Sequence, residues 1–217
     1  KEGAVLALRV LAGEVDLDGL GVAETSRTGS EPLPPFFAPP PERSSRRHGV
    51  VRAGNVEPAA ESPRPEARPE GRTLVLDIET QRSAADVGGW GNTDRMGLAL
   101  AVVFDVERDA YRTYFEADAA KLLLDLVMAD RVVGFNIDRF DLKVLSAYTE
   151  WDLARIRTLD MLDVIHRQLG FRISLAHLAE ANLGESKGGD GLQSLEWWKQ
   201  GRIDLIEQYC KKDVELT

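Results

Sequence analysis

The 217-residue sequence has little of what stabilises small secreted proteins or anchors proteins in membranes. It contains a single cysteine, Cys210, which excludes an internal disulfide framework and favours a reducing compartment. No apolar run reaches the ~18–20 residues of a membrane span, and no basic region followed by an apolar segment resembles a signal peptide. We therefore expect a cytoplasmic protein without a membrane segment.

Proline is absent from Thr73 onward, since all ten prolines lie between Pro32 and Pro69. Residues 31–71 are rich in Pro, Glu, Ala and Arg, which predicts a disordered linker. Residues 72–217 then predict one packed domain, and residues 1–30 are assigned to the uncharacterised end of a preceding region. Because the chain begins with Lys1 and ends inside a predicted helix, we expect an excerpt of a longer polypeptide whose last helix can be truncated.

The sequence also lacks the positive charge usual in proteins that bind nucleic acid by neutralising phosphates. The net charge is −9, and the part from Thr73 onward accounts for −8 of it, with 17 of the 27 basic and 25 of the 36 acidic residues. A polyanion would have to be bound through metal ions or a local groove. The phosphate-binding motif G-x-x-x-x-G-K-[ST] is absent as well, so the sequence contains no P-loop.

The apolar runs after the linker predict a mixed α/β sheet with helices on its faces. We expect strands at LVLDIET (74–80), GLALAVVFD (97–105), AYRTYFE (110–116), RVVGFN (131–136) and TLDML (158–162), with the second and third as antiparallel neighbours. We expect helices at Asp118–Met128, Arg139–Tyr148, about Asp163–Leu169, Ser174–Leu183, Leu192–Lys199 and from Asp204 onward. A Gly-rich loop is expected around Gly88–Gly91.

Two carboxylates, Asp77 and Glu79, interrupt the first predicted strand. Residues two apart in a strand point to the same face, so these side chains leave the sheet together from Cα atoms ~6–7 Å apart. Such a pair can share two divalent cations, which phosphoryl-transfer enzymes place ~3.5–4 Å apart. Taken alone, the pair fits a strand end with two solvated acids at least as well.

Two further segments carry candidate site residues. Asn136 ends a predicted strand, and Asp141 lies in the first turn of the next helix, where acids are favoured by the helix dipole. Tyr209 and Asp213 are four apart on a predicted helix and share a face, so they can hold a metal and orient an attacking water. The alternatives are a turn for Asn136, capping for Asp141, and an exposed Asp with a half-buried Tyr.

The joint order and spacing of these segments resemble the DnaQ-like, or DEDD, superfamily of 3′–5′ exonucleases. The motifs D-x-E, N-x-x-x-[FY]-D and Y-x-x-x-D match at Asp77–Glu79, Asn136–Asp141 and Tyr209–Asp213. The histidine subclass would have His in place of Gln208, so the sequence is similar to the tyrosine subclass. The segments TLDMLDV, SLAHLAEANLGESK, GLQSLEWWKQG and YCKKD resemble YprB-like exonuclease domains related to the proofreading domain of family B polymerases, over about 72–217.

The resemblance implies an RNase H-like fold with a mixed five-stranded sheet, its first three strands antiparallel. It implies that two Mg²⁺ or Mn²⁺ ions are bound. Their ligands would be Asp77, Glu79, Asp141 and Asp213. Tyr209 would position the attacking water. The resemblance also implies substrate contacts, to the terminal nucleotide or to a phosphate, by Thr80, Asn136 and Lys187.

We therefore expect a metal-dependent 3′–5′ exonuclease that acts on single-stranded 3′ ends, with DNA favoured, releases nucleoside 5′-monophosphates and serves DNA repair. An exoribonuclease of the same chemistry is the first alternative, because no motif reveals recognition of the 2′-OH. A non-catalytic nucleic-acid-binding or docking module is the second. A helicase domain in the same or a partner chain is expected from analogy with related domains.

Other polar and aromatic residues receive ordinary structural roles. Asp138, Asp160 and Asp163 are expected to cap helices or to be solvated, although Asp160 ends a predicted strand close to the expected site. Trp197 and Trp198 are adjacent, and we expect one of them to be buried and the other partly exposed.

Overall fold

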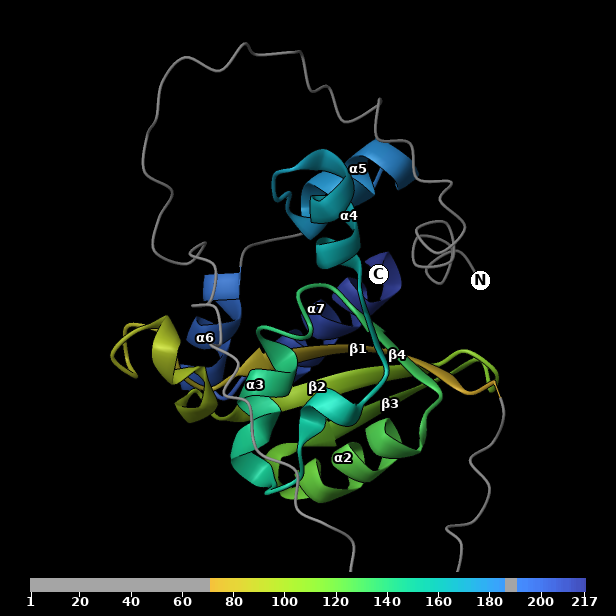
Figure 1. Cartoon of the computed structure of the whole chain (residues 1–217). Helices are drawn as coiled ribbons and strands as arrows, with labels where there is room; N and C mark the ends of the chain where they lie inside the picture. The colour runs from red at the N-terminus through yellow and green to blue at the C-terminus, as the bar shows by residue number, and fades with distance from the viewer. Residues whose placement is uncertain (1–70, 186–190) are drawn as a thin grey trace, which may run out of the picture. The chain divides into compact units, whose positions relative to one another are not determined.

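The computed structural model describes residues 71–185 and 191–217, which contain a five-stranded sheet flanked by helices (Figure 1). The strands are β1 (Thr73–Thr80), β2 (Leu98–Asp105), β3 (Ala110–Phe115), β4 (Arg131–Gly134) and β5 (Thr158–Asp160). The predicted region 1–30, all of the predicted linker except Gly71, and Lys187 lie outside the described residues.

Helices follow and separate the strands. The α-helices are α2 (Ala119–Met128), α3 (Asp141–Leu145), α4 (Met161–Leu169), α5 (Leu175–Leu183), α6 (Gly191–Lys199) and α7 (Ile203–Leu216). Short 3-10 helices are η3 (Trp90–Arg95), η4 (Glu116–Asp118), η5 (Ser146–Tyr148) and η6 (Leu153–Arg155). Within the described part of the chain, none of these helices combines the length and the apolar character that a bilayer span requires.

The strand order across the sheet is β3-β2-β1-β4-β5, which places β1 at the centre. β1 and β2, and β2 and β3, are antiparallel, so the predicted antiparallel arrangement of the first three strands is confirmed. β4 adds parallel to β1, and β5 adds parallel to β4. The spatial order differs from the chain order because β4 pairs with β1 and not with β3. This mixed sheet is compatible with the predicted RNase H-like fold.

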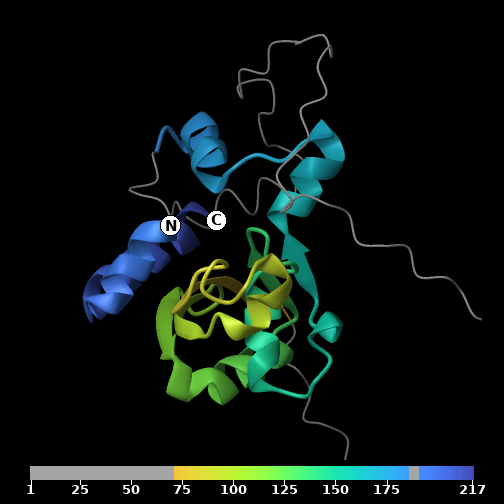
Figure 2. The same cartoon turned by 90° about the vertical axis from the view of Figure 1, so that its left-hand side faces the viewer.

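Two hydrophobic cores cover the two faces of β1. Leu74, Leu76 and Ile78 pack in one core with residues of α2 and α3, whereas Val75 packs in the other with residues of α4, α5 and α7. Figures 1 and 2 show α2 and α7 on opposite sides of the sheet. Because side chains alternate along a strand, the two acids of β1 share the face of Val75 and lie toward α7.

Two predicted strands are shorter than expected, for local reasons. The strand predicted at 131–136 ends at Gly134, because Asn136 adopts a left-handed conformation with φ 66°, which Asn tolerates better than most residues. The strand predicted at 158–162 ends at Asp160. The carboxylate of Asp160 accepts hydrogen bonds from the amides of Leu162 and Asp163, and this N-cap starts α4 at Met161.

Two other predicted elements also differ. The helix predicted at Arg139–Tyr148 is shorter, because the amide of Phe140 donates to the carbonyl of Asn136 in a turn that precedes α3, and η5 follows α3 at once. The loop predicted around Gly88–Gly91 leads into η3. In both places the sequence predicted the position of an element but not the tight turns at its ends.

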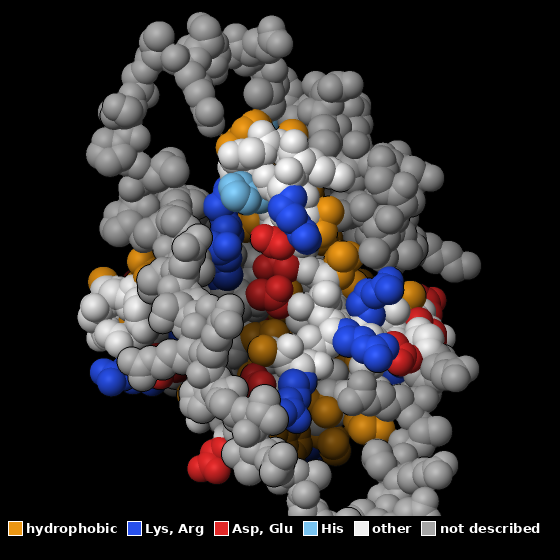
Figure 3. Space-filling model, viewed as in Figure 1, with side chains coloured by type: hydrophobic (Ala, Val, Ile, Leu, Met, Phe, Trp, Pro, Cys, Tyr) orange, Lys and Arg blue, Asp and Glu red, His pale blue; other side chains and the backbone are white. Residues whose placement is uncertain are grey.

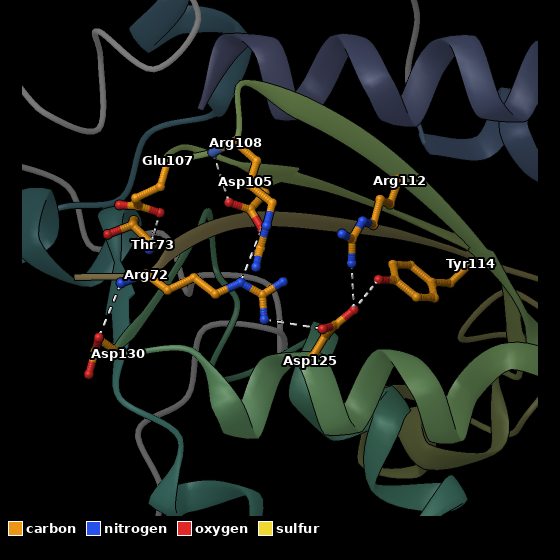
Figure 4. A network of polar contacts seen from close by, with 9 residues as sticks. All are labelled: Arg72, Thr73, Asp105, Glu107, Arg108, Arg112, Tyr114, Asp125 and Asp130. Carbon is orange, nitrogen blue, oxygen red and sulfur yellow. Dashed lines mark hydrogen bonds and ion pairs between the residues drawn. The ribbon is translucent and has the colours of Figure 1, made fainter. Parts of the chain in front are cut away.

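A network of charges centred on the buried pair Arg72 and Asp105 connects the start of β1 to its neighbours (Figure 4). Arg72 donates from Nε to Oδ2 of Asp105 at 3.0 Å and from Nη1 to Oδ1 of Asp125 at 3.1 Å. Arg108 also donates to Asp105, while Arg112 and the hydroxyl of Tyr114 donate to Asp125. The network joins β1, the end of β2, β3 and α2.

The balance of forces at Asp105 favours its charged form. Burial by itself raises the pKa of this carboxyl, but hydrogen bonds from Arg108 and Arg72 outweigh burial, so the pKa lies below its ordinary value. A carboxyl whose pKa is lower in the folded than in the unfolded state stabilises the fold at pH values above its unfolded-state pKa. This contribution is lost as the pH falls through the folded-state pKa.

We predict that Arg72→Met lowers the free energy of unfolding by about 3 kcal/mol near pH 7, because it leaves two carboxylates without their shared buried partner. The matched control Arg112→Met, at an exposed arginine that contacts the same Asp125, should cost at most about 1 kcal/mol. Urea denaturation measures both. The difference between wild type and Arg72→Met should shrink as the pH falls below the ordinary range of Asp, and a pH-independent difference would contradict the assignment.

Candidate metal centre

Three carboxylates from two elements far apart in the sequence meet at the β1–α7 contact. One carboxylate oxygen each of Asp77, Glu79 and Asp213 lies within 4.8 Å of the others. Glu79 and Asp213 are buried, and Asp77 is half-buried. Three of the four predicted metal ligands therefore lie within the reach of a common cation.

The residues of α7 that follow Tyr209 and Asp213 in sequence pack on the sheet, and this packing brings Tyr209 and Asp213 to the site. Cys210 and Val214 belong to the core that contains Val75, and the thiol of Cys210 donates to the carbonyl of Asp77 at 3.3 Å. Burial, with Asp77 and Glu79 nearby, raises the pKa of the Cys210 thiol well above its ordinary value. Cys210 is thus a packed thiol that holds α7 against β1.

Asp141 lies outside the three-carboxylate group but close to it. It lies in the first turn of a helix, as predicted, because it is the first residue of α3, and it is also buried, which was not predicted. Burial raises the pKa of Asp141 well above its ordinary value, against an opposing hydrogen bond from its own amide. The charges of Asp160 and Glu79 raise it further, and the amide of Ile78 opposes them. Asp141 therefore approaches β1 from the α3 side, within electrostatic range of Glu79.

Tyr209 and the three carboxylates line one cavity of about 610 Å³, whereas Asp141 is not among the residues that line it. Its walls are largely apolar and include Trp90, Phe140 and Leu195. The rings of Trp90 and Phe140 meet edge to face at a centroid distance of 6.4 Å, and Trp90 is about half exposed, at 47%. The cavity thus combines an acidic edge with aromatic walls.

The predicted substrate-contact residues have different surroundings. Thr80 lines the cavity, and its hydroxyl donates to the carbonyl of Arg82 at 3.1 Å. Asn136 is not among the residues that line the cavity, and its side-chain oxygen accepts a hydrogen bond from Arg172 at 2.6 Å. Lys187 falls outside the described residues. Of these three predictions, Thr80 alone is placed beside the acidic edge.

Asp160 has a larger role than the capping predicted for it. Besides capping α4, its carboxylate accepts hydrogen bonds from the amides of Asn136, at 2.9 Å, and Asp138. It therefore fixes the turn that leads into Asp141. Figure 3 shows acidic side chains gathered below α4 with basic side chains on either side. Burial raises the pKa of Asp160, against these amide hydrogen bonds.

Ser194 is a site neighbour that the sequence analysis did not single out. The hydroxyl of Ser194 on α6 donates to Oε2 of Glu79 at 2.5 Å, across 115 residues of sequence. Trp197, also on α6, contacts the ring of Tyr209 edge to face, with the ring centroids 6.1 Å apart. Trp197 and Trp198 are both half-buried, so the prediction of one buried indole is wrong. No local pattern marks such contacts, because they arise only when α6 packs beside α7.

The donor set fits a hard divalent cation. Carboxylate oxygens are the ligands that Mg²⁺ and Mn²⁺ prefer, and the three here belong to a buried or half-buried group. Bringing like charges together away from water is costly unless an opposite charge compensates them. Asp77, Glu79 and Asp213 are therefore suited to hold metal ions at this edge of the cavity.

Comparisons with known proteins support the fold. No protein-family model matches the sequence, and no match is found among curated proteins. Among solved structures, the chain is similar to the family B DNA polymerase from the hyperthermophilic archaeon Pyrobaculum calidifontis, with a TM-score of 0.51 and 16% sequence identity. The match covers 67% of this chain and only 23% of the polymerase chain. At this identity the similarity shows a shared fold.

We predict that Mn²⁺ raises the melting temperature of the wild type and that Asp213→Asn abolishes this rise. The same substitution should raise the metal-free melting temperature, because it removes one of three mutually repelling charges. Scanning fluorimetry with and without EDTA measures both effects. The control is Asp204→Asn, an exposed acid on the same helix paired with Arg202, which should leave the metal response unchanged. An equal response in Asp213→Asn would contradict the metal centre.

Proposed function

We propose that the chain is a metal-dependent 3′–5′ exonuclease of the DnaQ-like superfamily, tyrosine subclass, acting on single-stranded 3′ ends. The observation that carries the proposal is the convergence of Asp77, Glu79 and Asp213 with Tyr209 around one cavity. These residues come from the first and third motifs of that superfamily. A strand end with two solvated acids would not bring a buried Asp and Tyr from a distant helix to the same place.

The chain's own residues would divide the work by position. Asp77, Glu79 and Asp213 hold the cations, and Asp141, which lies within electrostatic range of Glu79, completes the ligand set. When bound, the cations activate water and stabilise charge on the phosphodiester oxygens. The carboxylates thus fix where the scissile phosphate must lie, at the acidic edge of the cavity.

Tyr209 would orient the attacking water. It lines the cavity one helical turn from Asp213, and its ring is held by the contact with Trp197. A phenol oxygen in this position can accept a hydrogen bond from the water and direct its lone pair at phosphorus. Its role is therefore orientation, which contributes to rate more than to metal affinity.

The cavity suits the terminal nucleotide of a single strand. Its aromatic walls at Trp90 and Phe140 can pack against a base of any sequence. Arg82 lines the same cavity and can contact a phosphate, and Thr80 would contact the same nucleotide. Asn136 and Lys187 would contact the substrate as the motif comparison implies. DNA is the favoured substrate, and the polymerase nature of the similar structure supports that preference.

A partner that delivers the strand belongs to the proposal. The part of the chain from Thr73 onward carries −8 of the net charge, which repels a polyanion outside the metal centre. A helicase domain, in the same or a partner chain, would supply single strands, and DNA repair in the cytoplasm is the setting that we propose. The corresponding test is whether adding such a helicase domain increases the rate at which the chain cleaves duplex DNA.

The direct test is a time course on 5′-labelled single-stranded DNA and matched RNA with Mg²⁺, Mn²⁺ or EDTA. We predict a metal-dependent ladder that shortens from the 3′ end, favours DNA, and is abolished by Asp77→Ala because a cation ligand is lost. His177→Ala, an exposed side chain on α5, is the control and should retain wild-type activity. Absence of a ladder on both substrates, with the chain folded and binding the strands, would favour the non-catalytic docking module.

We predict a different profile for Tyr209→Phe. It should lower kcat by roughly 10- to 100-fold, of the order of a lost orienting group, and leave the Mn²⁺-induced rise in melting temperature close to that of the wild type. Steady-state kinetics and scanning fluorimetry together check this. Wild-type kcat in the variant would remove Tyr209 from the mechanism, and loss of the metal response would make it a part of the metal centre.

A further inference from the structure

α6 contacts the candidate metal centre along one face. Gly191, Leu192 and Leu195 line the cavity, Ser194 contacts Glu79, and Trp197 contacts Tyr209. Residues three and four apart in a helix lie on the same side. α6 therefore approaches both a metal-ligand carboxylate and the phenol, although it carries none of the three motifs.

The contact between Ser194 and Glu79 is buried and short. Ser194 is 1% exposed, and its Oγ lies 2.5 Å from Oε2 of Glu79. The same Oγ lies 3.0 Å from the carbonyl oxygen of Gly191 in its own helix. A hydroxyl has one proton to donate, so the two acceptors compete. The shorter distance and the charge of an ionised carboxylate favour Glu79.

A donor at Oε2 restricts where the carboxylate of Glu79 can point. Glu has a long side chain with several rotatable bonds, and holding it in one rotamer costs entropy when a cation binds. A hydrogen bond made in advance removes part of that cost. It still leaves the other oxygen of Glu79, and further lone pairs, for metal. Loss of a group that orients a metal ligand in this way typically lowers metal affinity by about 10- to 100-fold.

We propose that Ser194 is a positioning residue that holds Glu79 in its metal-binding orientation. The inference rests on the proposed metal-dependent function, because it assigns Ser194 a role toward that same centre. The competing explanation is that Ser194 is a small residue packed under α6, whose hydroxyl is satisfied by Gly191 alone. In that case it would contribute to folding and not to metal affinity.

Calorimetric titration of the full chain with Mn²⁺ separates the two explanations. We expect Ser194→Ala to weaken Mn²⁺ binding about 10-fold, at the lower end of effects for residues that orient metal ligands. Ser194→Thr keeps the hydroxyl and should bind Mn²⁺ within about 2-fold of the wild type, whereas Ser194→Cys, with a similar volume but a weaker donor, should resemble Ala. Ser146→Ala removes an exposed serine hydroxyl bonded within its own segment and is the matched control.

Steady-state kinetics provide a second, independent measurement of the role of Ser194. The apparent Mn²⁺ requirement of Ser194→Ala should rise about 10-fold, while the KM for the DNA strand at saturating Mn²⁺ stays at the wild-type value. Metal-free melting temperatures, measured in EDTA, report any loss of folding. If the threonine methyl does not fit and Ser194→Thr melts early, the comparison of Ala and Cys with wild type still decides the matter.

The outcomes separate the two claims. Wild type that binds Mn²⁺ and cleaves DNA, with Ser194→Ala unchanged in Mn²⁺ affinity, overturns the role of Ser194 and leaves the exonuclease intact. If the wild type binds no Mn²⁺, that result overturns both the proposed function and the role of Ser194. A metal-free melting temperature lowered in Ser194→Ala, with unchanged Mn²⁺ affinity, identifies Ser194 as a packing residue.

Discussion

β1 lies between β2 and β4 and is covered on both faces, yet it carries two carboxylates toward α7. Burying charge is among the costliest things that a fold can do unless opposite charge compensates it. The third carboxylate, Asp213, arrives from the helix that covers this face. The arrangement of β1 under α7 therefore brings three like charges together at one edge of the cavity, which suits this group of carboxylates to bind metal ions.

The two ends of β1 show two solutions to the same electrostatic problem. At its start, the negative charge of buried Asp105 is compensated from within the protein by Arg72 and Arg108. At its end, we propose that metal ions from outside supply the compensation. Their binding would then be coupled to stability, because repulsion in the metal-free site is relieved when they bind.

The features that could be predicted from the sequence are those set by the periodicity of a strand or a helix. Alternation in LVLDIET placed Asp77 and Glu79 on one face, and the spacing of four placed Tyr209 and Asp213 on one side of α7, as the structure has them. The five strands and the antiparallel pairing of the second and third followed from apolar runs separated by turns, whereas the antiparallel arrangement of the first three came from the family resemblance. These features depend on neighbours within a few residues, so a single sequence carries them.

The parts that sequence did not predict depend on contacts between distant segments. Asp160 has a local signal for capping, but nothing local reveals that its carboxylate also binds the turn at Asn136. Ser194 meets Glu79 only because α6 packs beside α7. The left-handed conformation of Asn136 shortens β4 and sets the turn before Asp141, and tight turns of this kind depend on the hydrogen bonds around them.

Anomalous diffraction from crystals of the chain soaked in Mn²⁺ shows whether the three carboxylates bind metal, because it locates metal without relying on activity. We predict anomalous peaks about 2.0–2.3 Å from carboxylate oxygens of Asp77, Glu79 and Asp213, within the range expected for hard divalent cations bound to oxygen. Crystals with these three carboxylates together and no anomalous peak among them at millimolar Mn²⁺ would contradict it.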